Sequence, residues 1–198
     1  MPLLYLIRHP RTQPDPSLPA SQWELSDEGR AQVRALAALP LWAAVGVVIT
    51  SAQRKAAVVG EAVRAAHGVP WQVVEALDEA LRDSWLGPEE FNRAQRAFFA
   101  QPEVPPVPGW ETAQSAGARF AAAMDGALAQ HPGQSLAVVA HATVLTLYAA
   151  RLRGAAPRYD DWRTIEFAAI MAVDRASLRP LTPFLGAPWA GLPSPATP

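Results

Sequence analysis

The chain contains no cysteine, and Lys55 is its only lysine. The absence of cysteine excludes disulfide bonds, zinc–thiolate sites and catalysis by a cysteine nucleophile. No apolar run is long enough for a membrane-spanning helix, so we expect no membrane partner. A large excess of one charge is also missing: the net charge is -1, which argues against a nucleic acid as partner.

The first apolar stretch, residues 3–7, does not have the pattern of a signal peptide. Arg8 and His9 interrupt it, and no cationic region precedes it. We therefore expect a cytoplasmic enzyme.

Half of the 198 residues are hydrophobic, which is enough for the core of one large α/β domain. Short apolar runs predict strands at 3–7, 46–50, 71–76, 135–140 and 165–173. Segments with helical periodicity alternate with these runs, which favours a mostly parallel sheet covered by helices on both faces. We therefore predict an α/β fold, a three-layer α/β/α sandwich around a sheet of about six strands.

Residues at the ends of the predicted helices support this assignment of helices and strands. Ser26 is a suitable N-cap for the helix that follows it, and Gly68 is a suitable stop for a helix over 51–68. The alternation of strands and helices is weaker over 85–110. We expect a short cap there, inserted into a single domain that spans 1–198. The proline-rich tail 183–198 is expected to lack regular structure, with Phe184 and Trp189 holding it to the body.

Ligands of parallel α/β sheets bind beyond the carboxyl ends of the strands. Residues that can carry chemistry follow four of the predicted strands: Arg8 and His9, the segment from Ser51 to Arg54, Glu79, and His141. A single histidine in such a place often has a structural role. Two at equivalent places, with two arginines nearby, indicate a binding site.

The other two histidines, His67 and His131, lie at predicted helix ends, where histidine commonly faces solvent. The chemistry of the remaining set fits a phosphoryl group. Arginine forks match phosphoryl oxygens, and a neutral imidazole can attack phosphorus if its other nitrogen is held by a hydrogen bond. The alkoxide that leaves needs a proton, which a nearby carboxylic acid can supply.

The segment "LIRHPRT", residues 6–12, resembles the Arg-His-Gly-x-Thr signature of the histidine phosphatase superfamily, the phosphoglycerate-mutase-like proteins. Further segments resemble motifs of the same family in the same order along nearly the whole chain. They are "WELSDEGRAQVRAL" at 23–36, "TSAQRKAAVVGE" at 50–61, which resembles the family's Ser-x-x-x-Arg-Ala helix and carries Arg54, "LDE" at 77–79, "GWET" at 109–112 and "VVAHATVL" at 138–145.

The resemblance implies a role for each matched residue. His9 would be the nucleophile that becomes phosphohistidine, and Glu79 would protonate the leaving group and later activate water. Asp83 is the alternative acid. The phosphoryl oxygens would be bound by Arg8, Arg54 and His141. No cofactor is implied, and no cluster of residues has the spacing of metal ligands.

The chain departs from the family pattern at four positions. Pro10 replaces a glycine and offers no N–H donor, and Arg11 replaces an acid and adds charge at the mouth of the site. Asp15 stands where many members have an asparagine, and a carboxylate cannot donate to phosphate, so we exclude it as a ligand. Ala142 replaces a glycine and keeps its N–H. These changes bear on the identity of the substrate. They leave all five residues to which the resemblance assigns a role in place: Arg8, His9, Arg54, Glu79 and His141.

Three functions are compatible with the sequence. The first is a metal-independent phosphatase that hydrolyses a small organic phosphomonoester through phosphohistidine. The second is phosphoryl transfer of the phosphoglycerate mutase type, although the 85–110 segment is short and offers only Arg93 and Arg96. The third is a low-activity member that binds a phosphorylated ligand or partner. A homodimer is compatible with each of them.

Five aromatic residues lie in or near the predicted cap. We expect most of them to pack the cap against the domain, and one or two to line the pocket of the leaving group. They are Trp85, Phe91, Phe98, Phe99 and Trp110.

Overall fold

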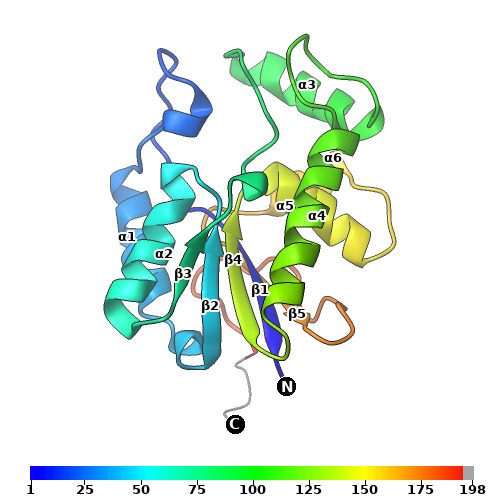
Figure 1. Cartoon of the computed structure of the whole chain (residues 1–198). Coiled ribbons are helices and arrows are strands. Elements are labelled where there is room, and N and C mark those ends of the chain that lie inside the picture. Colours follow the sequence, from blue (N-terminus) through cyan, green and yellow to red (C-terminus); the bar gives the residue numbers. More distant parts are fainter. Residues whose placement is uncertain (194–198) are drawn as a thin grey trace.

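Five strands form one sheet at the centre of the computed structural model, which describes residues 1–193 (Figure 1). The strands are β1 (Leu3–Arg8), β2 (Val45–Thr50), β3 (Trp71–Val73), β4 (Ser135–Ala140) and β5 (Ile170–Asp174). Their order is β3-β2-β4-β1-β5, and β5 alone runs antiparallel to its neighbour β1. The predicted α/β class is confirmed, with five strands in the described residues instead of about six.

Helices cover both faces of the sheet, which gives the expected three layers (Figure 1). On one face, Leu4 and Leu6 of β1 pack in a core with α4 (Ala113–Gln130) and α5 (Ala142–Leu152). On the other face, Tyr5 packs in a second core with α1 (Asp27–Ala37) and α2 (Arg54–His67). Successive side chains of β1 therefore enter opposite cores, as the alternation of a strand requires.

The predicted helix ends are confirmed at two positions. The Ser26 hydroxyl accepts a hydrogen bond from the Gly29 N–H at 3.0 Å and caps α1. Gly68 ends α2 with a φ of 69°, a left-handed conformation that glycine adopts without steric cost.

Two predicted strands begin or end elsewhere. β3 stops at Val73, because Glu75–Leu77 forms a short 3-10 helix. The strand predicted over 165–173 begins only at Ile170: the short helix α6 (Tyr159–Thr164) precedes it, and Ala168 has a φ of 60° that an extended strand does not allow. The apolar run there is buried in a turn before it enters the sheet.

Helix α3 (Pro88–Ala100) lies with α6 above the carboxyl ends of the parallel strands (Figure 1). Short 3-10 helices at Ala20–Gln22 and Pro40–Ala44 complete the described secondary structure. Trp189 is buried and its Nε1 donates to the Ala168 carbonyl at 2.8 Å, so it holds the tail to the body as expected. Phe184 packs partly buried against the core, and tail residues 194–198 lie outside the described residues. Over the described chain, no helix has both the length and the apolar character needed to cross a bilayer.

Candidate active site

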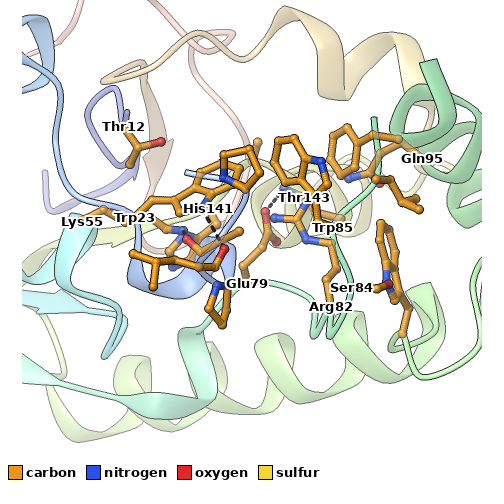
Figure 2. A pocket seen from close by; sticks show the side chains of 18 of the residues that line it. Thr12, Trp23, Lys55, Glu79, Arg82, Ser84, Trp85, Gln95, His141 and Thr143 are labelled. Atoms are coloured by element: carbon orange, nitrogen blue, oxygen red, sulfur yellow. Dashed lines mark hydrogen bonds between the residues drawn. The ribbon is translucent and has the colours of Figure 1, made fainter. Parts of the chain in front are cut away.

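A cavity of about 520 Å³ opens at the carboxyl ends of the parallel strands. Figure 2 shows side chains from distant parts of the sequence meeting around it. Its polar lining includes Arg8, His9, Lys55, Glu79, Arg82 and His141. Its aromatic lining consists of Trp23, Trp85, Phe91, Trp110, Trp162 and Phe167.

His9 follows β1 directly and is buried in the cavity wall. Its Nδ1 lies 2.7 Å from the carbonyl oxygen of Pro10. A carbonyl oxygen only accepts hydrogen bonds, so Nδ1 carries the proton and the neutral ring keeps its lone pair on Nε2. Burial, together with the charges of Lys55 and Arg8, lowers the pKa of His9 well below its usual value, so the imidazole is neutral near pH 7.

His141 follows β4 and lies beside His9, with the two ring centroids 5.0 Å apart. A hydrogen bond of 2.7 Å joins its Nε2 to the Ser51 hydroxyl. Its Nδ1 is buried and has no hydrogen-bond partner among the described residues. Burial and the proximity of His9 lower the pKa of His141 well below its usual value. A buried ring nitrogen without a partner is suited to contact a bound ligand.

Arg8 supplies a fixed cation at the end of β1. Its guanidinium donates to the Ile165 carbonyl and stacks on Phe167, 3.8 Å from the ring centroid. Its Nε is buried without a partner among the described residues. Burial lowers the pKa of Arg8 to about 10, against the opposing effect of Glu79, so the side chain is cationic at neutral pH.

The predicted role of Arg54 in the phosphate site does not agree with its position. Its side chain is 57% exposed, forms an ion pair with Glu61 at 2.6 Å and does not line the cavity. The next residue, Lys55, is buried and lines the cavity instead, with its Nζ donating to the Ala20 carbonyl at 2.6 Å. Burial lowers the pKa of Lys55 to about 8, partly offset by Glu79.

Helical geometry explains this difference. Successive side chains of a helix point about 100° apart, so adjacent residues face different surroundings. Lys55 shares a face of α2 with the buried residues Val59 and Val63, whereas Arg54 lies toward Glu61. Two signals in the sequence could have identified Lys55: the spacing of these valines, and the Ser-x-x-x-Arg-Ala motif, whose arginine position counted from Ser51 falls on residue 55.

Three backbone N–H groups hold Glu79, two of them in the first turn of α5. Oε2 accepts from Thr143 at 3.1 Å, and Oε1 accepts from Val144 at 3.3 Å and from Ala80 at 2.9 Å. These N–H groups fix the orientation of the carboxyl group and stabilise its anionic form once a proton has been given up. Asp83, the alternative acid, also lines the cavity but is exposed.

Two departures from the family pattern lie outside the cavity. Asp15 is partly exposed and accepts hydrogen bonds from the Ser17 N–H and hydroxyl, which lower its pKa. Its exclusion as a phosphate ligand therefore agrees with its position. Arg11 pairs with Glu28 at 2.8 Å and does not line the cavity. Its guanidinium carbon nevertheless lies 4.9 Å from the ring centroid of the lining residue Phe167, and its charge contributes to the lowered pKa of Arg8, so the added charge is present near the mouth.

Three of the five aromatic residues expected around the cap line the cavity, more than the one or two that the sequence suggested. They are Trp85, Phe91 and Trp110. Phe98 and Phe99 are buried in the core instead. Trp23, Trp162 and Phe167 come from other parts of the chain, and sequence reasoning did not connect them with the site.

Within residues 1–193, no group of three or more histidine, aspartate and glutamate side chains is arranged to hold a metal ion. The positive charge around the cavity comes from arginine and lysine.

A family model, the histidine phosphatase superfamily (branch 1), matches residues 4–180. Phosphoserine phosphatase from Entamoeba histolytica, solved with 3-phosphoglyceric acid, has a TM-score of 0.76 and 18% identity, covering 96% of this chain and 99% of that chain. Mycobacterial glucosyl-3-phosphoglycerate phosphatase has a TM-score of 0.69 and 20% identity, covering 90% and 95% of the two chains. YhfR from Bacillus stearothermophilus has a TM-score of 0.70 and 20% identity, covering 93% and 96%. At such identities the likeness shows a common fold, and no curated protein sequence matches the chain.

Proposed function

The chain belongs to the histidine phosphatase superfamily, and we propose that it hydrolyses small organic phosphomonoesters through a phosphohistidine at His9, without a metal ion. The observation that carries this proposal is the hydrogen bond from His9 Nδ1 to the Pro10 carbonyl. It leaves the lone pair on Nε2 of a neutral imidazole, and the ring lines a cavity that also contains Arg8 and Lys55. A nucleophile and cations for a phosphoryl group are thus together in one site.

In the first step, the cations hold the phosphoryl dianion over His9. Arg8 and Lys55 bind its oxygens, and the free Nδ1 of His141 supplies a further contact. Lys55 takes the place that the sequence assigned to Arg54. The His9 Nε2 lone pair attacks phosphorus while the bond to the ester oxygen breaks, and the leaving oxygen takes a proton from the Glu79 carboxyl group.

In the second step, water replaces the leaving group. Glu79, now a carboxylate, accepts a proton from the water as its oxygen bonds to phosphorus. The bond between phosphorus and Nε2 breaks, inorganic phosphate leaves, and neutral His9 and protonated Glu79 are restored.

The alternatives have less support from the cavity. A mutase must hold an anionic substrate in two orientations, yet Arg93 and Arg96 of α3 both lie outside the lining, and Arg96 packs over Tyr159. The only support for a binding protein without turnover is the pair of substitutions at Pro10 and Asp15. Asp15 lies outside the cavity, and the backbone carbonyl of Pro10 still holds the Nδ1 proton of His9, so neither substitution removes a group that the proposed mechanism uses.

We also propose that the leaving group is bulky or aromatic. Six aromatic side chains line the cavity; Phe167 lies against Arg8 and His9, and the other five line the rest of it. Burial of an apolar leaving group against them is favourable, at about 25 cal/mol per Å².

The test is turnover of p-nitrophenyl phosphate by the purified protein. We expect hydrolysis by the wild type and by an Arg93→Gln control, whose side chain is exposed and outside the cavity. A folded His9→Ala variant should lose nearly all of it. Wild-type turnover in that variant would contradict the proposal.

Three further expectations stay predictions from the sequence: a single domain over 1–198 with a cap around 85–110, a cytoplasmic location, and a homodimer. Limited proteolysis, cell fractionation and light scattering would test them in turn.

A further inference from the structure

Arg82 lines the same cavity, and no motif in the sequence pointed to it. It belongs to the irregular segment between Glu79 and α3, and Figure 2 shows its side chain extending toward Glu79. Among the described residues, no hydrogen bond or ion pair engages its guanidinium. The guanidinium carbon instead lies 5.0 Å from the ring centroid of Phe91 and 5.8 Å from that of Trp110. Two rings of the cap thus support a cation that has free donors.

This cation acts on the groups at the phosphoryl end of the cavity. Burial lowers the pKa of Arg82, and the charge of Glu79 opposes that effect. Arg82 in turn contributes to the lowered pKa values of Arg8, His9, Lys55 and His141. Lowering of this kind requires a short distance or a low dielectric between Arg82 and these groups. A bound dianion would relieve the repulsion.

We propose that Arg82 is a third phosphoryl-binding cation, which reaches the phosphoryl group from the cap side of the cavity. The inference rests on the proposed function, since it takes the cavity to be a phosphoryl site. Arg8 and Lys55 each give one donor to a backbone carbonyl, of Ile165 and of Ala20. Arg82 keeps its full planar fork for the three equatorial oxygens of the transition state. Phosphate binding then depends on the cap as well as on the sheet.

The competing role is a contact with an anionic substituent of the leaving group. Inorganic phosphate separates the two roles, because it has no leaving group. A residue that binds the phosphoryl group affects the affinity for inorganic phosphate, and a residue that binds only the leaving group does not.

The experiment measures competitive inhibition by inorganic phosphate during hydrolysis of p-nitrophenyl phosphate, and direct phosphate binding by calorimetry. Arg82→Gln should weaken phosphate binding by about tenfold or more, as expected for a lost charge-assisted hydrogen bond. The control Arg93→Gln, also an arginine near the cap, should stay within about twofold of the wild type. Arg82→Met keeps the apolar stem against Phe91 and Trp110, and it carries the same test if the glutamine variant does not fold.

Phosphate affinity within about twofold of the wild type in a folded Arg82 variant would overturn the inference. Calorimetry measures phosphate binding without turnover, so this outcome can be told apart from failure of the proposed function. If the wild type binds phosphate but forms no phosphohistidine, the proposed chemistry is wrong, and the effect of Arg82 on phosphate binding is still measured.

Discussion

At the scale of single residues, Pro10 explains how the nucleophile is prepared. Its ring fixes φ near −65°, and its carbonyl oxygen accepts the Nδ1 proton of His9 at 2.7 Å. The acceptor is a backbone carbonyl, which any residue at this position would offer, so the change to proline removes an N–H donor and leaves the group that orients the imidazole in place.

From the lowered pKa of Lys55 we expect kcat/KM to depend on pH. This parameter reports ionisations of the free enzyme, in which the pKa of Lys55 is lowered to about 8. A lysine is cationic below its pKa, so kcat/KM should fall as pH rises through about 8. Lys55→Arg should move this fall upward by at least about one pH unit, because arginine keeps its charge.

Arg54→Gln is the matched control for Lys55, because it alters the adjacent side chain outside the cavity. It should leave the alkaline limb in place. An alkaline limb that moves in Arg54→Gln and stays fixed in Lys55→Arg would show that the two residues have the opposite roles.

Glu79→Gln should affect substrates according to their leaving groups. Alkyl phosphates need a proton on the leaving oxygen, and p-nitrophenol hardly does. We expect the loss of turnover to be about a hundredfold or more for alkyl phosphates and much smaller for p-nitrophenyl phosphate. Equal losses on the two substrates would exclude Glu79 as the acid, and Asp83→Asn would then be tested.

The residues at strand ends could be predicted, and some side-chain directions could not. His9 and His141 each follow an apolar strand, so the sequence placed them at one edge of the sheet. Lys55 could have been predicted too, because it stands at the arginine position of the Ser-x-x-x-Arg-Ala motif counted from Ser51. Arg82 lies in an irregular segment with no periodicity from which its direction could be inferred.

At the scale of elements, the N-terminus of α5 organises much of the site. His141 is its N-cap residue, and the N–H groups of Thr143 and Val144 hold Glu79. Ser51, which follows β2, bonds to His141. The proposed acid and the proposed phosphate ligand are therefore fixed by the same turn of helix.

The cap predicts substrate preference. We expect kcat/KM for naphthyl phosphate to exceed that for 3-phosphoglycerate by at least roughly tenfold, or about 1.4 kcal/mol of differential transition-state binding. Trp85, which lines the cavity and packs against Trp23 with centroids 5.7 Å apart, should contribute. Trp85→Ala should reduce the preference, and Val104→Ala, an exposed residue outside the cavity, should not.

A panel of phosphomonoesters measures this preference directly. Efficient turnover of 3-phosphoglycerate above that of phenyl and naphthyl phosphates would contradict it.

At the scale of the whole molecule, the alternation of strands and helices was enough to predict the architecture. The family match confirms the predicted family and the class of enzyme, a phosphatase. The start of β5 was missed, because an apolar run buried in a turn and one buried in a sheet have the same pattern. All five apolar runs predicted as strands join the sheet, and the expected total of about six exceeded the runs that the sequence offers.

The intact protein should remain active in the presence of a chelator. Arg8, Lys55 and Arg82 supply the positive charge of the cavity from its own side chains. Turnover after dialysis against EDTA should equal that of the untreated protein. Complete loss, with recovery on addition of one divalent ion, would show that the proposed mechanism lacks a component.

The most direct test of the account is to trap the phosphorylated enzyme. Rapid acid-free quenching of the wild type with a radiolabelled phosphomonoester should place label on the peptide that contains His9, with the base stability and acid lability of phosphohistidine. His9→Ala should take up no label. An active wild type that carries no label, or carries it on a different residue, would contradict the central role given to His9.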